Sequence, residues 1–403
     1  MDRLVRLKDD KAGIGILPAT VSDGVLLTNT TPLAAGVGLL PAGTDCNGMT
    51  LTRFFNHAFG SGDSGKLAFL HLSDTHRYPF GMRKAVEMMG DDDGIRFTVI
   101  TGDLQLTDEM KEILRKSPGP IYLLPGNHDV NDDFSCDSTL ARNEYIFPFC
   151  GAAVNMGSDR SSYWHQDVVT DGASLRLIAF DEYEYSVVGN PVESHCVVYS
   201  QTQMEWFMDL LRNTPSYYNL ILLHHQPVAT HRDVGNTGLF TSENAPRYYE
   251  YQGGDSDKEG VRDGVCDAGL IPKIMAAYLS GGTFAGTFFC GDAARTRMTL
   301  SCDFSGIRPC RFIAHIGGHT HWDVCEYLPA FPEQLQLLID QDRTQKYHYS
   351  DMARSETDVS AYCINRYTLD FDKREIVIER IGAHLTDGGA DRSRIVYPLE
   401  REE

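Results

Sequence analysis

LAFLHLSDTH (67–76), FTVITGDL (97–104) and IYLLPGNHD (121–129) are apolar segments that each end in a cluster of polar residues. Each is rich in β-branched or bulky apolar side chains and is short enough to be one buried strand. The polar residues come where such a strand would leave its sheet. These three segments therefore predict neighbouring strands that carry chemically active groups at their ends.

The segments between these strands have the length and amphipathic pattern of helices. They cover residues 81–90 and 107–117, and Thr107 is in place to cap the second helix ahead of Asp108 and Glu109. Strand and helix alternation of this kind predicts two βαβ units. Because the carboxyl ends of parallel strands meet at one edge, we expect five residues to converge there: Asp74, His76, Asp103, Asn127 and His128.

The composition favours one large domain with additions. The chain has 403 residues, of which 42% are hydrophobic, and a net charge of −20 from 56 acidic and 36 basic residues. Such a charge repels polyanions and disfavours a nucleic-acid partner. The ten cysteines form no CxxC pair, which predicts buried free thiols. Without an apolar leader or a membrane-length apolar stretch, we expect a soluble cytoplasmic protein with no membrane partner.

The chain divides into a short appended segment and one main domain. Residues 1–65 are rich in turn signals and end in the linker-like GSGDSG (60–65), and the main domain is expected at 66–403. An amphipathic helix is predicted over 201–213, and an irregular insertion over about 231–309. Residues 362–382 read as two strands joined at Asp372 and Lys373, which predicts a hairpin.

Five clusters of metal-binding residue types follow the apolar segments in order. They are Asp74 with His76, Asp103, Asn127 with His128, His224 with His225, and His319 with His321. Mixed oxygen and imidazole ligands suit manganese, iron or zinc. A set of seven or more ligands is too large for one tetrahedral ion, whereas two ions that share Asp103 account for it. Such a pair, roughly 3.5–4 Å apart, can stabilise both the attacking and the leaving oxygen of a phosphoryl displacement.

The sequence resembles the calcineurin-like metallophosphoesterase superfamily, whose motifs are DxH, GD, GNH(D/E), a single or doubled His, and GHxH. All five motifs occur between Asp74 and His321. The resemblance implies an α/β fold, a four-layer α/β/β/α sandwich of two mixed sheets. It assigns Asp74, His76 and His321 to one metal, Asn127, His224 and His319 to the other, and Asp103 to both. Of the doubled histidine, His224 is taken because the pattern places the ligand first.

The implied activity is hydrolysis of phosphomonoesters or phosphodiesters by a hydroxide that bridges the two metals. His128 would donate a proton to the leaving group, and Asp129 would orient its ring. The expected partner is a small-molecule phosphoester. Each motif alone has a simpler interpretation, because Asp and Asn at strand ends are usually turn formers.

Two alternative functions remain open. The segments at 40–50 and 366–384, and the insertion, resemble parts of metallophosphoesterase proteins encoded in phages and prophages of gut bacteria. This would imply a structural or binding protein that keeps the fold, such as a virion-associated tail component. A nuclease of the same superfamily would need a locally basic rim around the site.

Overall fold

The computed structural model describes the following residues: 65–130, 138–151, 154–170, 173–184, 197–228, 269–290, 296–321, 323–328, 330–340, 342, 354–383, 386–387, 390–391 and 393–399. The predicted appended segment 1–65 lies outside the described residues except for Gly65. Residues 231–268 and 291–295 of the predicted insertion also lie outside them. The predicted boundaries of both segments stay predictions.

The first sheet has six strands in the order β17-β14-β13-β1-β2-β3. Their bounds are β1 (Lys66–Leu72), β2 (Ile95–Thr101), β3 (Ile121–Leu124), β13 (Cys363–Asp370), β14 (Glu375–Gly382) and β17 (Arg394–Pro398). Strands β1, β2 and β3 are parallel, and the helices α2 (Phe80–Asp91) and α3 (Asp108–Arg115) connect them. The two predicted βαβ units are therefore confirmed. Thr107 caps α3, since its side chain accepts a hydrogen bond from Met110 N.

The second sheet has seven strands in the order β11-β12-β10-β7-β6-β5-β4. Their bounds are β4 (Asn155–Met156), β5 (Trp164–Val169), β6 (Ser174–Ala179), β7 (Tyr218–Leu223), β10 (Arg311–Gly317), β11 (Val324–Leu328) and β12 (Phe331–Leu338). The inner strands β6, β7, β10 and β12 are parallel, and the outer pairings are antiparallel. The carboxyl ends of β6, β7 and β10 thus lie at one edge.

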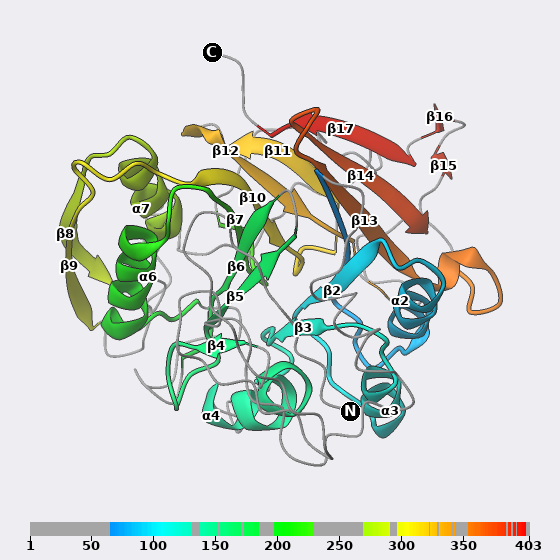
Figure 1. Ribbon diagram of the computed structural model, residues 1–403. Helices are drawn as coiled ribbons and strands as arrows, with labels where there is room; N and C mark the ends of the chain where they lie inside the picture. Colours follow the sequence, from blue (N-terminus) through cyan, green and yellow to red (C-terminus); the bar gives the residue numbers. More distant parts are fainter. Residues whose placement is uncertain are drawn as a thin grey trace, which may run out of the picture.

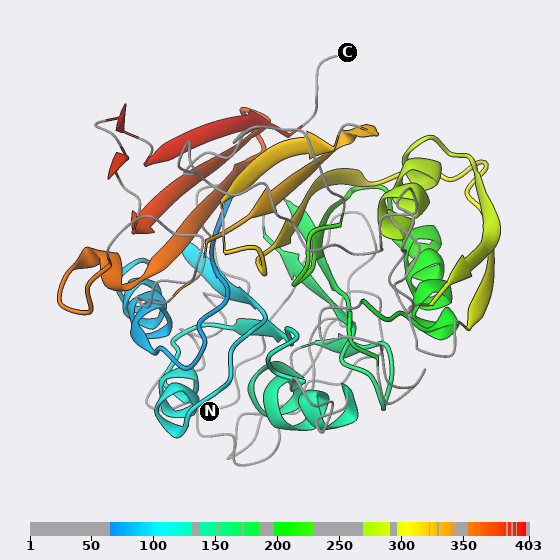
Figure 2. The same ribbon diagram turned by 180° about the vertical axis from the view of Figure 1, so that it is seen from behind.

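The two sheets pack between helices on both sides (Figure 1). Helices α2 and α3 lie outside the first sheet, and α6 (Gln201–Asn213) and α7 (Leu270–Leu279) lie outside the second, as the reverse view in Figure 2 also shows. This arrangement confirms the predicted four-layer sandwich. Helix α6 has the predicted bounds and is capped by Ser200, whose side chain accepts from Gln203 N. Three short helices, α4 (Ser138–Ala141), η2 (Arg142–Gly151) and η3 (Val359–Ala361), and the strand pair β15 (Thr386–Asp387) and β16 (Ala390–Asp391) complete the described elements.

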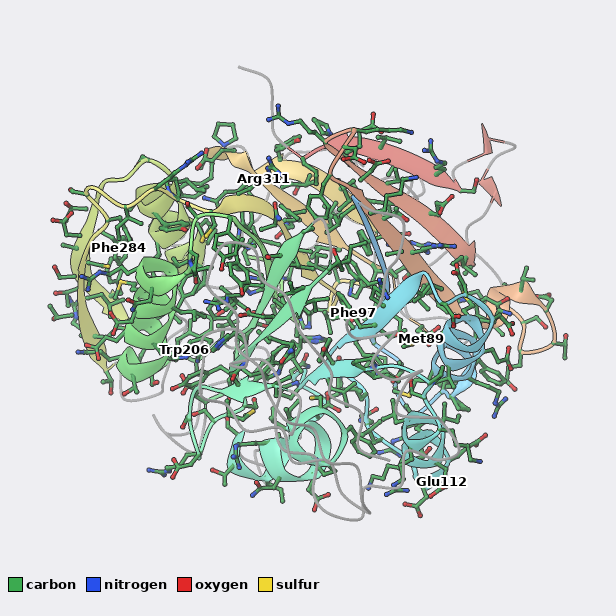
Figure 3. All side chains as sticks on the ribbon, in the orientation of Figure 1. Met89, Phe97, Glu112, Trp206, Phe284 and Arg311 are labelled. Atoms are coloured by element: carbon green, nitrogen blue, oxygen red, sulfur yellow. The ribbon has the colours of Figure 1, made fainter. Side chains whose placement is uncertain are left out.

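One hydrophobic cluster joins both sheets, and hydrogen bonds link them at two places. Trp164 Nε1 on β5 donates to the carbonyl of Leu123 on β3, at 3.1 Å. Tyr397 on β17 donates to the carbonyl of Cys325 on β11, at 2.9 Å. Phe97 faces this shared core through its ring contact with Tyr122, and Met89 of α2 lies on the outer face of the first sheet (Figure 3). These contacts hold the strand ends of the two sheets in a defined relation.

A second hydrophobic cluster fills the space between the second sheet, α6, α7 and the hairpin of β8 (Thr283–Phe289) and β9 (Arg297–Asp303). The described part of the predicted insertion therefore packs against α6. The six cysteines that the structure describes as free thiols are all buried, as the sequence predicted: Cys150, Cys290, Cys302, Cys310, Cys325 and Cys363.

Candidate metal centre

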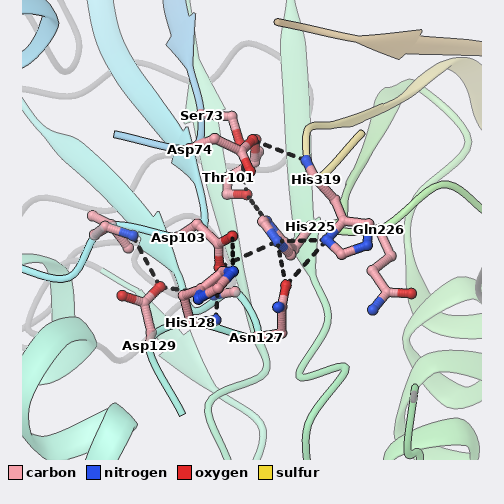
Figure 4. Close-up of polar contacts among 12 residues, drawn as sticks. Ser73, Asp74, Thr101, Asp103, Asn127, His128, Asp129, His225, Gln226 and His319 are labelled. Carbon is pink, nitrogen blue, oxygen red and sulfur yellow. Dashed lines mark hydrogen bonds and ion pairs between the residues drawn. The ribbon is translucent and has the colours of Figure 1, made fainter. Parts of the chain in front are cut away.

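The predicted polar clusters converge where the carboxyl ends of the two sheets meet (Figure 4). Asp74 and His76 follow β1, Asp103 follows β2, and Asn127 follows β3. The second sheet contributes residues that follow β7 and β10, which are His225, His319 and His321. The side chains come from positions about 250 residues apart in the chain but form one buried group.

A first ligand set consists of four buried side chains: Asp74, His76, Asp103 and His321. One ligand atom from each lies within 4.8 Å of all the others. His321 Nε2 is 3.2 Å from His76 Nε2 and 3.2 Å from Asp74 Oδ1. His76 Nε2 is also 3.7 Å from Asp103 Oδ2. Two carboxylates and two imidazoles around one point are a ligand set that suits a borderline divalent metal.

A second ligand set contains Asp103 again, together with His225 and His319. His225 Nε2 is 3.3 Å from Asp103 Oδ1 and 3.2 Å from His319 Nδ1. Asn127 Oδ1 lies 3.1 Å from His225 Nε2 and 3.0 Å from His319 Nδ1, which adds an amide oxygen to the set. The two sets therefore meet at Asp103, each facing a different oxygen of its carboxylate.

The hydrogen bond to Thr101 decides which nitrogen of His225 can bind a metal. His225 Nδ1 donates to the carbonyl oxygen of Thr101 at 2.7 Å (Figure 4). A metal-binding histidine commonly donates its other ring N–H in this way, which fixes the tautomer and the ring orientation. Nε2 is then the ring nitrogen that faces Asp103, Asn127 and His319 and is left for a metal.

Three observations fit a metal at this position. Asp74 Oδ1 is buried and accepts no hydrogen bond in the structure, although His321 lies beside it. Ring nitrogens of different histidines face each other at 3.2 Å in both sets. Positive φ angles, which are uncommon for side chains other than Gly, occur at Asp74, His76, Asp103, His319 and His321. Backbone strain of this kind is concentrated at functional sites.

The electrostatics of the centre also favour a bound cation. Burial would raise the pKa of Asp103, but the neighbouring His225 and His76 hold it well below its usual value. Burial would lower the pKa of His225, but the carboxylates of Asp103 and Asp74 raise it to about 10. Buried carboxylates that stay ionised need a positive charge nearby, which a protonated His225 or a metal can supply. Burial lowers the pKa of His76 to about 4, so this imidazole is neutral and able to bind a metal at neutral pH.

The structure places His225, and not the predicted His224, in the second ligand set. Successive side chains of β7 point to opposite faces. Leu223 belongs to the core that both sheets share, and Leu222 to the core beneath α6 and α7. His225 continues the first face toward Asp103, whereas His224 stacks on Phe180 on the other face, with ring centroids 4.8 Å apart. The choice of His224 is therefore corrected to His225.

His128 and Asp129 lie beside the centre, and the contacts of Asp129 are with the backbone of two turns. His128 N donates to Asp103 Oδ1 at 2.8 Å, and its ring packs edge-on against the ring of His76, with the ring centroids 5.0 Å apart. The Asp129 carboxylate accepts backbone hydrogen bonds from Leu104, Gln105 and Gly126. It therefore holds the turns after β2 and β3 together, and its predicted role in orienting the His128 ring stays a prediction.

Comparison with known proteins confirms the resemblance that the motifs predicted. Residues 67–259 match the family model for the calcineurin-like phosphoesterases. The matched stretch ends before His319 and His321, which the structure brings to the same cluster. The family and the buried cluster of His and Asp fit a metal-dependent phosphoesterase. No curated protein matches the chain.

Solved structures of related fold are similar over most of the chain. They include PhoD, with 12% identity and a TM-score of 0.44, covering 84% of this chain and 71% of that one. GAP50, the anchor in the inner membrane complex of Plasmodium, has 11% identity and a TM-score of 0.41, covering 84% and 90%. A putative 5'-nucleotidase from Staphylococcus aureus has 10% identity and a TM-score of 0.36, covering 84% and 55%.

None of the helices in the described part of the chain has both the length and the apolar character needed to cross a membrane.

Proposed function

We propose that the chain hydrolyses phosphoester bonds with two metal ions that share Asp103. The observation that supports this most is the position of the Asp103 carboxylate between the two ligand sets. Its Oδ2 faces His76 at 3.7 Å, and its Oδ1 faces His225 at 3.3 Å. One carboxylate with an oxygen toward each set is the arrangement that a shared ligand requires.

The proposed ligands divide evenly between the two positions. Asp74, His76 and His321 would complete the first, and Asn127, His225 and His319 the second. The mixture of imidazole and oxygen donors favours manganese, iron or zinc, whereas calcium and magnesium prefer oxygen alone. A bound pair would polarise the phosphoryl oxygens and lower the pKa of the attacking water.

His128 is the proposed proton donor to the leaving oxygen. Its side chain is 25% exposed, whereas that of Asp103, 4.0 Å from His128 Nε2, is 1% exposed. The imidazole can therefore contact a substrate bound on the open side of the centre. Its backbone bond to Asp103 Oδ1 keeps this histidine at a fixed position relative to the shared ligand. An imidazole is the side chain that most often serves as a general acid or base in enzymes.

The substrate class we propose is a small phosphomonoester or phosphodiester. A protein that kept the fold only for binding would have no need for two ligand sets and a histidine beside them. The completeness of these ligand sets supports an enzyme over a phage structural protein that only keeps the fold. The net charge of −20 supports a small substrate over a nucleic acid.

The test is hydrolysis of a panel of aryl phosphomonoesters and phosphodiesters by the full chain. The protein is stripped with a chelator, reloaded with manganese, iron or zinc, and compared with Asp103→Asn treated in the same way. We expect hydrolysis that depends on metal and is lost in the variant. If no ester is hydrolysed with any loaded metal, or if Asp103→Asn is as active as the wild type, the proposed function is wrong.

A further inference from the structure

A buried group of polar residues lies directly behind the second ligand set. Glu182 follows β6, the parallel neighbour of β7, so that it lies beside the turn that carries His224 and His225. Its side chain is fully buried, and none of the sequence motifs includes it. A buried carboxyl group is costly unless its neighbours satisfy it.

Glu182 accepts hydrogen bonds from the backbone of the turn after β7. Its Oε2 accepts from His225 N at 2.9 Å and from Gln226 N at 2.8 Å. Both residues are themselves buried, so these two N–H groups need an acceptor within the protein. With Thr101 holding the ring of His225, the backbone and the side chain of this residue are each fixed by one partner.

The other oxygen of Glu182 starts a chain of hydrogen bonds through the second sheet. Oε1 lies 3.3 Å from His224 Nδ1, and His224 Nε2 lies 3.2 Å from His315 Nδ1. His315 Nε2 lies 2.9 Å from Gln334 Oε1. All of these side chains are buried. The series of hydrogen bonds ends where Gln334 Nε2 donates to the carbonyl of Pro272 at the start of α7.

The Pro272 carbonyl fixes the direction of these hydrogen bonds. Because the amide nitrogen of Gln334 must face a carbonyl, its oxygen accepts from His315 Nε2. His315 Nδ1 then accepts from His224 Nε2, and the lone pair on His224 Nδ1 faces Glu182. Glu182 thus meets two backbone donors on Oε2, while Oε1 lies beside the acceptor nitrogen of His224 and 3.4 Å from the hydroxyl of Tyr199.

We propose that Glu182 is the positioning residue of the second ligand set: it holds the turn after β7 so that His225 Nε2 faces Asp103 and His319. This inference rests on the proposed two-metal function. Glu182 binds no metal and touches no substrate. It acts through the backbone N–H groups of His225 and Gln226. The position of Glu182 is in turn fixed by His224, which is itself held by His315.

The hydrogen-bond pattern makes a specific prediction about substitutions. In Glu182→Gln the amide oxygen can accept from the two backbone N–H groups, while the amide nitrogen donates to His224 Nδ1. Glu182→Ala removes every one of these bonds. Glu182→Asp keeps the acid but shortens its reach. If positioning is the role, the neutral Gln should restore what Ala and Asp lose.

The experiment measures binding of Mn²⁺ or Zn²⁺ to the chelator-treated full chain by equilibrium dialysis. In the wild type we expect two metals, and in His225→Ala one. Glu182→Ala should weaken the second metal by about 10–100-fold, the range typical of lost outer-shell partners, and leave the first unchanged. Glu182→Gln should bind both metals like the wild type.

Glu184→Gln is the matched control. Glu184 is also a buried acid two residues along, but its carboxylate accepts from Ser161, Ser200 and Gln203 and not from the His225 turn. This variant should bind both metals. Equal loss of both metals in Glu182→Ala and the control would indicate a general effect on folding and overturn the proposal.

The remaining outcomes separate this proposal from the proposed function. If His225→Ala loses no metal, or if the wild type binds fewer than two, the two-metal function fails. If those results are as expected but Glu182→Ala binds the second metal at wild-type affinity, Glu182 has no positioning role. If Glu182→Ala does not fold, Glu182→Asp takes its place, and wild-type affinity for the second metal in that variant overturns the proposal.

Discussion

The turns that follow the first sheet are held by Asp129, whereas the turn that follows β7 in the second sheet is held by Glu182, and the two acids meet different partners. Both oxygens of Asp129 accept from backbone N–H groups, at Leu104, Gln105 and Gly126. Only one oxygen of Glu182 does so, and the other faces His224. Burial raises the pKa of Asp129 to about 6 and that of Glu182 to about 7.

This difference shows that the two supporting acids have different hydrogen-bond requirements. The Asp129 site needs two acceptor oxygens, so it needs a carboxylate. The Glu182 site needs one acceptor and one group that can donate to an imidazole, and an amide can supply both. Asp103 is the residue where the two halves meet, since its oxygens face His76 and His225.

The largest effect is expected when Asp103 is changed, because that change breaks both halves. Asp103→Ala removes the carboxylate that both ligand sets share, so both metals should be weakened and phosphoester hydrolysis should be lost. The loss should exceed the 10–100-fold that outer-shell changes typically cost. Metal analysis and turnover of an aryl phosphoester measure it. Loss of only one metal would show that Asp103 belongs to one set alone.

The next effect concerns His128, which lies outside both ligand sets. His128→Ala should keep both metals and lose about 10²–10⁴ in turnover on esters with poor leaving groups, the usual contribution of a general acid. On nitrophenyl esters the loss should be smaller, because that leaving group barely needs a proton. Turnover of the two substrate types provides the measurement. Equal loss on both would remove the proton-donor role.

Replacing each supporting acid, Asp129 and Glu182, by its amide compares the two hydrogen-bond patterns directly. Asp129→Asn would direct an amide nitrogen at a backbone N–H, and such an unsatisfied buried group costs about 1–3 kcal/mol. Glu182→Gln keeps an acceptor for the turn and should cost clearly less. Urea unfolding of the metal-free variants measures both free energies. Equal losses in the two variants would contradict the different hydrogen-bond patterns.

The smallest effect on the centre is expected at Glu184. Burial and the charge of Asp181 raise the pKa of Glu184 from 4.5 to about 8, so the folded state favours the protonated acid. The stability that this group contributes is fully present below pH 4.5 and is lost as the pH rises through about 8. Glu184→Gln cannot ionise. Over this range the unfolding free energy of the wild type should therefore fall relative to the variant. Parallel pH profiles would contradict the raised pKa.

Much of the fold and most of the cluster could be predicted because their signals are local in sequence. The strand segments before Asp74 and Asp103 are marked by short apolar runs, and α6 by its Ser200 cap and helical periodicity. Asp74, His76, Asp103, Asn127, His319 and His321 were all in motifs, and the structure brings them together. Their roles as ligands stay a prediction until metal is measured.

The remaining features depend on how the two sheets pack. Adjacent His224 and His225 differ only in the face to which they point, and the shared core that contains Leu223 decides between them. The alternation along β7 was the available signal, because Leu223 and His225 are two residues apart. Glu182 is separated from His225 by 43 positions, so no local pattern connects them. Asp129 follows His128 in sequence, yet its carboxylate turns toward backbone N–H groups.

The most direct test of the central claim is a Mn²⁺ titration of the chelator-treated full chain, followed by electron paramagnetic resonance. Two ions that share Asp103 should bind per chain and give a spin-coupled signal at saturation. His225→Ala should hold one uncoupled ion, and His224→Ala should hold the coupled pair. A single ion per wild-type chain, or two ions without coupling, would contradict a pair of metal positions joined at Asp103.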